Sequence, residues 1–238
     1  MAKSKVFLTA EWRKLALAQY EVEKSILEKY LPPNTVLDDW QGKYYVSLVG
    51  FMFLDVKLRG FRIPFHTNFE EVNLRFYVKY KDGLEWKRGA VFIQEIVPLP
   101  AITLVANTIY KEKYKTLSMK HLWTFQGDQL QVEYLWKTKE WNSFAVKTSS
   151  QAMEIPIGSE EEFITEHYWG YTKLGLNRTS EYGVQHPRWQ VYPVESYTIK
   201  ADFRENYGED FANLNHVEPD SVILAEGSEI SVMAGRKF

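Results

Sequence analysis

The sequence predicts a mainly β fold of the α+β class, built around one large antiparallel sheet. Three observations indicate this class: many short runs rich in β-branched and aromatic residues, turn residues between these runs, and few segments with a helical pattern. Many strands with few helices favour a sheet that curls into a barrel or cone, because closure removes exposed sheet edges. No linker, internal repeat or low-complexity tract divides the 238 residues, so we expect a single domain over residues 1–238.

The predicted strands follow one another along most of the chain. They cover residues 43–53, 71–80, 87–97, 102–110, 119–125, 129–136, 168–173, 181–184, 189–200, 221–225 and 229–233. Asp82-Gly83 and Gly127-Asp128 lie between such runs, and glycine supplies the positive φ angles that tight hairpins require. The order of the runs therefore predicts a meander.

Two segments have a helical pattern. The first covers residues 22–31 and ends at Pro32-Pro33, because proline lacks the amide that would continue the helix. The second begins at Ser159, whose hydroxyl can accept from a free amide while Glu162, three residues on, reaches back as in a capping box.

Composition and motifs exclude several kinds of chemistry. The chain has no cysteine, which removes disulfides, thiolate metal sites and thiol nucleophiles. The five histidines form neither an HxH pair nor an HExxH motif, and no Gly-rich phosphate loop or nucleophile elbow is present. We therefore expect no metal site and no cofactor.

Charge and hydropathy argue against nucleic-acid and membrane partners. The formal net charge is −2 with acidic and basic residues interleaved, so no basic footprint for a phosphate backbone is present. No apolar run has the length of a signal peptide or a transmembrane helix. We expect a cytoplasmic protein whose partner is a small molecule.

An alternating run over residues 71–78 presents one apolar row and one polar row. The polar row consists of Glu71, Asn73, Arg75 and Tyr77. One interpretation is a strand with one face in water. The other is that the polar row lines a cavity, where a carboxylate, an amide, a guanidinium and a phenol could orient an anionic or carbonyl ligand.

A second alternating run covers residues 110–115. Lys111, Lys113 and Lys115 would share one face, and Tyr110, Glu112 and Tyr114 the other. Inward lysines would be desolvated beside like charges, which lowers an amine pKa and favours attack on a carbonyl group. Outward lysines would form a solvated strand edge that discourages aggregation, and the tyrosines would then point inward.

The tetrapeptide from His186 to Trp189 is a further candidate. Pro187 stiffens this turn and could hold the His186 imidazole, the Arg188 guanidinium and the Trp189 indole near a common mouth. The alternative is a packed loop, since aromatic residues often serve in packing.

Several phrases resemble a known bacterial family. They are residues 44–51 (YYVSLVGF), 69–78 (FEEVNLRFYV), 89–92 (GAVF), 166–169 (EHYW) and 186–189 (HPRW). In this order, they resemble the YqjF-like proteins, a family of unassigned function grouped with the acetoacetate decarboxylase-like superfamily. The resemblance implies a large, strongly bent antiparallel sheet that forms a cone-like barrel around a pocket, flanked by a few helices.

The resemblance also has consequences for the site. The decarboxylases form a Schiff base through the first of two paired lysines, and an ungapped alignment places Tyr114 at that position and Lys115 at the second. Tyrosine cannot form an imine, whereas an alignment shifted by one residue would restore a lysine. Glu71 matches the active-site glutamate of the decarboxylases.

Three functional hypotheses follow. The first is a small-molecule binding domain for a carboxylic or keto acid, with a pocket lined by Glu71, Asn73, Arg75, Tyr110 and Tyr114 and with His186 at its mouth. The second is a carbon–carbon lyase for a small keto acid, with Lys113 or Lys115 as the amine and Glu71 as the acid–base group. The third is a structural protein whose barrel is filled by side chains.

Overall fold

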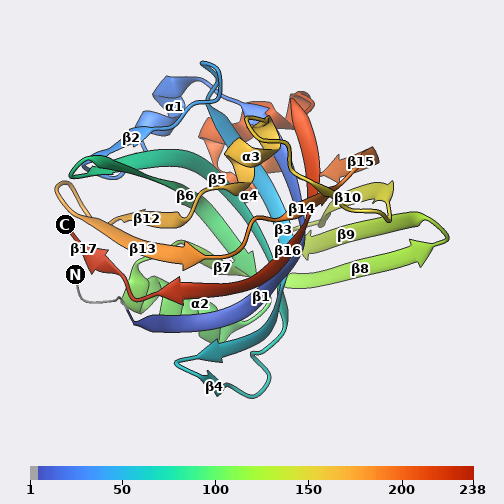
Figure 1. Cartoon of the computed structure of the whole chain (residues 1–238), viewed down its shortest axis with the longest axis horizontal. Helices are drawn as coiled ribbons and strands as arrows, with labels where there is room; N and C mark the ends of the chain where they lie inside the picture. Colours follow the sequence, from blue (N-terminus) through green and yellow to red (C-terminus); the bar gives the residue numbers. More distant parts are fainter. Residues whose placement is uncertain (1–4) are drawn as a thin grey trace.

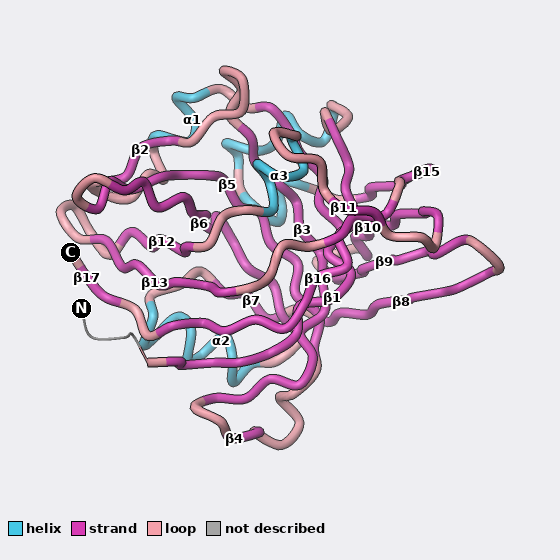
Figure 2. Tube along the Cα trace, in the orientation of Figure 1, coloured by secondary structure: helices cyan, strands magenta, loops and turns pink. Residues whose placement is uncertain are grey.

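A computed structural model describes residues 5–238, apart from the side chain of Ile109. Strands dominate the described chain, and the few helices are short (Figures 1 and 2). The strands belong to two sheets. The thirteen-stranded sheet contains β1 (Val6–Glu21), β2 (Thr35–Leu37), β3 (Tyr45–Leu58), β4 (Phe61–Arg62), β5 (Phe69–Asp82), β6 (Glu85–Val97), β7 (Tyr114–Thr116), β11 (Met153–Glu154), β12 (Trp169–Lys173), β13 (Thr179–Gln185), β14 (Gln190–Tyr192), β16 (Ser221–Met233) and β17 (Arg236–Lys237).

The second sheet and the helices complete the fold. The four-stranded sheet contains β8 (Ser118–Gln126), β9 (Gln129–Lys137), β10 (Trp141–Ser149) and β15 (Val194–Lys200). The helices are α1 (Lys24–Glu28), α2 (Pro100–Val105), a π-helical turn (Ala106–Tyr110), α3 (Glu160–Thr165), α4 (Phe203–Tyr207) and a 3-10 segment (Glu209–His216).

In the large sheet, the series of paired strands that begins at β16 also ends at β16. The path runs through β16, β1, β3, β5, β6, β12 and β13, and β13 then pairs with β16 at Val184 with Val232 and at Gln185 with Ser231. The β6–β12 step is parallel, and the other steps of this path are antiparallel. The predicted mainly β fold with a large bent sheet is thereby confirmed (Figure 1).

The apolar row of β5 packs into the main core. Val72, Leu74 and Phe76 are fully buried in one cluster with Tyr134 and Trp136 of β9. The opposite face of β5, which carries the polar side chains, therefore faces a second hydrophobic cluster, to which β1, β3 and α3 contribute.

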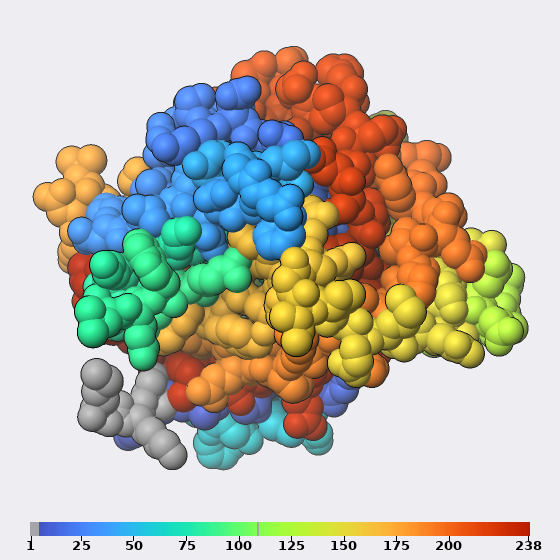
Figure 3. All heavy atoms as spheres, turned by 45° about the horizontal axis from the view of Figure 1, so that its top comes forward, coloured from blue at the N-terminus to red at the C-terminus, as the bar shows by residue number. Residues whose placement is uncertain are grey.

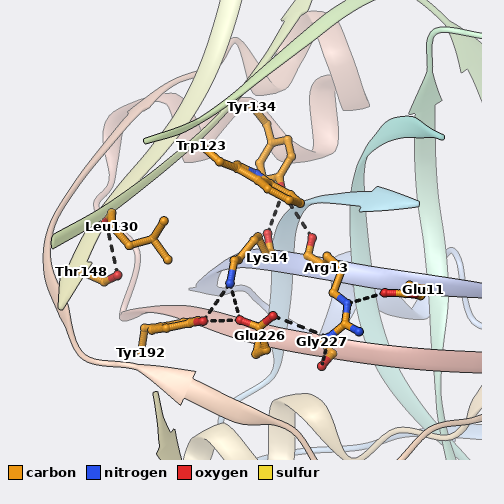
Figure 4. A network of polar contacts seen from close by, with 10 residues as sticks. All are labelled: Glu11, Arg13, Lys14, Trp123, Leu130, Tyr134, Thr148, Tyr192, Glu226 and Gly227. Carbon is orange, nitrogen blue, oxygen red and sulfur yellow. Dashed lines mark hydrogen bonds and ion pairs between the residues drawn. The ribbon is translucent and has the colours of Figure 1, made fainter. Parts of the chain in front are cut away.

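The two sheets are joined at Tyr134 (Figure 4). Its hydroxyl donates to the carbonyl oxygen of Lys14 over 2.7 Å, and its ring passes so close to Gly50 that a Cβ there would lie 2.8 Å from Tyr134 Cδ2. Lys14 has a φ of 53°, and its ammonium group donates to the hydroxyl of Tyr192 (2.8 Å) and to the carboxylate of Glu226. The register between β1 and β3 shifts between Arg13 and Ala16, and Lys14 there contacts Tyr134 of the small sheet through its backbone and Tyr192 and Glu226 of the large sheet through its side chain.

Helix α3 covers the polar face of β5. Phe163 and Ile164 pack in the second cluster with Tyr77. In Figure 3, the yellow surface around α3 lies between the blue surface of the N-terminal part of the chain and the red surface of the C-terminal part. Ser159 Oγ accepts from the amide of Glu162 over 3.2 Å, as predicted. The Glu162 carboxylate instead accepts from the amide of Gly158, so the reciprocal half of the capping box differs from the expectation.

The main error in the predicted elements is the segment 102–110. Its β-branched residues predict a strand, but it forms α2 and the π-helical turn. Pro100 occupies the first turn of α2, where its fixed φ suits a helix and its missing amide costs nothing. Lys111 then adopts a left-handed conformation (φ 60°), so the expected alternation over residues 110–115 begins only after it.

Other boundaries also differ. The first helix is confined to Lys24–Glu28, the predicted strand 189–200 is divided into β14 and β15, and the strands β1 and β10 were not expected. The two strands predicted over 221–233 form the single strand β16. Gly227 permits this continuity, because it has a φ of +78° and a Cβ there would lie 1.9 Å from the carbonyl oxygen of Trp12.

Candidate functional site

The polar row of β5 is buried rather than solvent-exposed. Glu71 is 3% exposed, Asn73 1% and Tyr77 1%, while Arg75 is half-buried. Carboxylates and amides are seldom buried to this extent without a structural or functional reason. The interpretation with this face in water is therefore wrong for Glu71, Asn73 and Tyr77, whereas the interpretation that the row lines a cavity stays a prediction.

Pairing between strands brings further polar residues beside this row. Asn73 of β5 is paired with Glu95 of β6, and Glu95 is paired with Tyr114 of β7. Asn73 Nδ2 donates to Glu71 Oε1 over 2.9 Å, and the Tyr114 hydroxyl donates to Glu71 Oε2 over 3.2 Å. Residues of β5 and β7 thus form one hydrogen-bonded group, and Glu95 lies on β6, which pairs with both strands.

Glu112 brings a third carboxyl to this group. Its Oε1 accepts from Thr172 Oγ1 of β12 over 2.6 Å, and its charge acts on both Glu71 and Glu95. We call Glu71, Glu95 and Glu112 the interior acidic cluster. Glu112 and Tyr114 are partly accessible as whole residues, but their carboxyl and phenol groups are surrounded by protein.

Burial controls the protonation of the cluster. It raises the pKa of Glu71 to about 7, against the hydrogen bonds from Asn73 and Tyr114. Burial likewise raises the pKa of Glu112 to about 7. The pKa of Glu95 lies well above its ordinary value because of burial and of the charges of Glu112 and Glu71. At neutral pH the cluster therefore holds protons that it can exchange.

Tyr182 of β13 forms a further wall of the site. Burial, followed by the charges of Glu112, Glu95 and Glu71, raises the pKa of its phenol well above the ordinary value. The ring lies over Gly170 of the paired strand β12, where a Cβ would be 2.2 Å from Tyr182 Cζ. Glycine is required at this position because the phenol occupies the space of a side chain.

Several polar atoms of the site lack a hydrogen-bond partner. Among the described residues, these buried atoms include Asn73 Oδ1, Glu95 Oε2 and Arg75 Nε. Arg75 Nη2 is 3.5 Å from the carbonyl oxygen of Ile164, and the guanidinium lies 5.6 Å from the ring centre of Tyr77. Because buried polar groups are normally paired, these atoms leave unused hydrogen-bonding capacity.

The predicted lysines lie around β7 rather than beside Glu71. Tyr114 holds the position paired with Glu95, and Lys115 is the next residue along, paired with Ile96. The ammonium group of Lys113 lies 5.2 Å from the ring centre of Tyr30. Burial lowers the pKa of Lys113, partly offset by the charge of Glu112.

Tyr110 and His186, which were predicted for the same pocket, lie in other parts of the structure. Tyr110 ends the π-helical turn, is 39% exposed and packs edge-on against Phe7. His186 is stacked between Tyr168 and Trp189, and lines an open groove of about 660 Å³ with Glu11, Arg13, Lys57 and Glu229 among others. The structure therefore brings together Glu71, Asn73, Arg75 and Tyr114 of the predicted set.

A second buried ionic network was not predicted as functional. His167 Nε2 is 3.3 Å from Asp38 Oδ2, and Asp38 also receives Lys79 (2.9 Å) and Arg88 (2.7 Å). Burial lowers the pKa of His167 to about 4. Burial alone would raise the pKa of Asp38, but its hydrogen bonds, from His167 first, hold it well below the usual range. The pairing of distant strands places these residues together, so no local motif could have identified them.

Metal-site arrangements and transmembrane helices are both absent from the described residues. Within residues 5–238, no three His, Asp or Glu side chains have the arrangement of a metal site. None of the helices in the described chain combines the length and apolar character of a transmembrane helix.

The architecture is that of the acetoacetate decarboxylase-like proteins. Acetoacetate decarboxylase from Legionella pneumophila aligns with a TM-score of 0.64 and 11% identity, over 100% of this chain and 90% of that chain. The enduracididine biosynthesis enzyme MppR, in a complex with pyruvate, aligns with a TM-score of 0.65 and 9% identity, over 100% and 91%. An acetoacetate decarboxylase-like enzyme from Sphingomonas wittichii gives 0.65 and 10%, over 98% and 93%. At these identities the likeness establishes the fold alone.

Sequence comparison identifies the family. Residues 9–229 match DUF2071, a family described as an uncharacterized conserved protein, and the chain belongs to it. The uncharacterized protein YqjF of Bacillus subtilis is 27% identical over 190 residues, which cover 78% of this chain and 75% of that protein. The expected relation to YqjF-like proteins is thereby confirmed.

Proposed function

We propose that the interior of the large sheet binds a small organic acid, a carboxylic or keto acid, between Arg75 and the interior acidic cluster. The observation that carries this proposal is the unused hydrogen-bonding capacity of buried atoms on β5 and β6. Arg75 Nε is an N–H donor without an acceptor, and Asn73 Oδ1 and Glu95 Oε2 lack partners on the same side of the sheet. A bound carboxylate would satisfy Arg75 through charge-assisted hydrogen bonds.

The remaining polar groups would handle the rest of the ligand. Glu71 is held by Asn73 and Tyr114, so its position is defined, and its pKa near 7 suits exchange of a proton with a ligand at neutral pH. MppR, which shares the fold, has been solved with pyruvate, and this supports a small acid as the ligand class.

Thermal unfolding with a panel of small carboxylic and keto acids tests this proposal. A ligand at a hundred times its Kd adds about 2.7 kcal/mol, which should raise Tm by roughly 5–10 °C. Arg75→Met should remove the shift and leave folding intact, whereas Arg178→Met, at an exposed arginine, should retain it. The absence of any shift across the panel would contradict the proposal and favour an interior that serves only packing.

A second candidate is a carbon–carbon lyase that uses a lysine Schiff base on a keto acid. The lowered pKa of Lys113, which increases the fraction of free amine, favours it. The register of β7, with Tyr114 and not a lysine paired to Glu95, speaks against it. Borohydride trapping with pyruvate and acetoacetate distinguishes the two, since a mass increase on Lys113 or Lys115 would support the lyase and an unchanged mass would reject it.

A further inference from the structure

The interior acidic cluster differs from the other buried carboxylates in having no cationic side chain in direct ion-pair contact, although the charges of Arg75 and Lys113 act on Glu71 and Glu112 from farther away. Within residues 5–238, neither Glu71, Glu95 nor Glu112 forms an ion pair with a lysine, arginine or histidine. Asp38, by contrast, receives three cationic side chains. Without such a contact, burial favours the protonated carboxyls, and a cation from outside the chain would stabilise their ionised forms.

The hydrogen bonds of the cluster also leave acceptor oxygens without a donor. Asn73 already gives an N–H to Glu71, and Tyr114 gives its hydroxyl to the same carboxyl. The buried atoms that remain without partners there, Asn73 Oδ1 and Glu95 Oε2, are oxygens. Both atoms can accept hydrogen bonds when the carboxyls are ionised, and an ammonium, amidinium or guanidinium group would supply several donors at once.

Arg75, in contrast to the cluster, has a donor that lacks an acceptor. Its Nε–H is buried without an acceptor, and it lies two residues from Asn73 on the same face of β5, about 7 Å along the strand. One strand face thus offers acceptors that need a cation and, a short distance away, a donor that needs an anion. A single small molecule with both charges matches this arrangement.

We infer that the ligand is a zwitterion, a small carboxylic or keto acid that also carries a cationic nitrogen group, with its carboxylate at Arg75 and its nitrogen among Glu71, Asn73 and Glu95. This inference rests on the proposed function and specifies its ligand class. Among the described residues, no three carboxylate or imidazole side chains, those of the cluster included, are arranged as metal ligands, so an organic cation is the partner inferred. The raised pKa of Glu71 and of Glu95 adds that the arriving cation should displace protons from the cluster.

Isothermal titration with charged acids and their isosteres tests the inference. The probes are ω-amino and ω-guanidino acids of two to six carbons, each compared with the acid in which a methyl or isobutyl-type group replaces the cation, for example 5-aminopentanoate with hexanoate. Because a hydrogen bond to a charged group contributes about 1.5–3 kcal/mol, the cationic member of the best pair should bind roughly 10- to 100-fold more tightly. Titrations at pH 7 in phosphate and in Tris should also reveal proton release.

Two isosteric variants complete the test. Glu95→Gln should remove most of the preference for the cationic probe, whereas Glu85→Gln, an exposed position on the same strand, should retain it. If acids bind but the cationic members have no advantage, the zwitterion is rejected while the proposed function stands. If neither these probes nor any acid of the thermal panel binds, both fail together.

Discussion

Asn73 and Glu95 lie directly opposite each other on β5 and β6, and each side chain ends in a buried oxygen atom without a hydrogen-bond partner. Two unpaired acceptors across one sheet destabilise the folded state, since each has lost its hydration without gaining a bond. Natural chains retain such arrangements where function requires them. The pair is therefore the point at which stability and the proposed binding function can be separated by mutation.

Glu95→Gln should stabilise the protein at alkaline pH. The pKa of folded Glu95 lies above its ordinary value, so the glutamate destabilises the folded state increasingly as pH rises from about 4.5 through that raised pKa. The amide has no proton to lose, so we expect a gain in the free energy of unfolding at pH 8 and little change at pH 4.5. Urea unfolding at both pH values measures this. A loss of stability at pH 8, or an equal effect at both pH values, would contradict it, and Glu85→Gln is the control.

His167 should make the fold sensitive to acid. Its folded pKa of about 4 is below the unfolded value of 6.5, so the folded state loses stability as pH falls through this interval, by on the order of 3 kcal/mol in total. His167→Gln can still donate to Asp38 but cannot be protonated, and it should flatten the profile between pH 6.5 and 4. His216→Gln, at an exposed histidine, should leave the profile unchanged, and an equally steep profile for His167→Gln would refute the assignment.

The sequence allowed half of the candidate site to be predicted. Alternation along one strand identified Glu71, Asn73 and Arg75, because neighbours two apart share a face whatever the tertiary structure. Glu95 and Glu112 were not singled out, since their place depends on which strands pair with β5, which periodicity does not encode. Residues 102–110, which form most of α2 and the π-helical turn, were predicted as a strand because of their β-branched residues, and Pro100 is the signal for a helix start there.

Tyr134→Phe should weaken the junction of the two sheets. The variant keeps the ring that packs over Gly50 but removes the donor to the Lys14 carbonyl oxygen, leaving a buried acceptor unsatisfied. We expect a loss of about 1–3 kcal/mol in the free energy of unfolding, with ligand binding unchanged. Tyr197→Phe, where the hydroxyl donates to Glu218 at the surface, should cost less than about 0.5 kcal/mol. Equal losses in the two variants would indicate that the junction depends on packing alone.

Gly170→Ala should disturb the site without changing any of its polar groups. A methyl group at this position would lie 2.2 Å from Tyr182 Cζ and 2.5 Å from its hydroxyl oxygen, so the phenol must move away from the interior acidic cluster. We expect destabilisation of about 1–3 kcal/mol and weaker binding of whichever acid raises Tm in the wild-type protein. Gly183→Ala on the paired strand is the matched control, because its Cβ would meet its nearest atom, in Trp169, at an ordinary 3.5 Å. Gly170→Ala should be as costly in a Tyr182→Phe background, which keeps the ring, but should cost little in a Tyr182→Ala background, where the space is open. An equal cost of Gly170→Ala in the wild-type and Tyr182→Ala backgrounds would show that the close approach of Tyr182 does not explain the glycine.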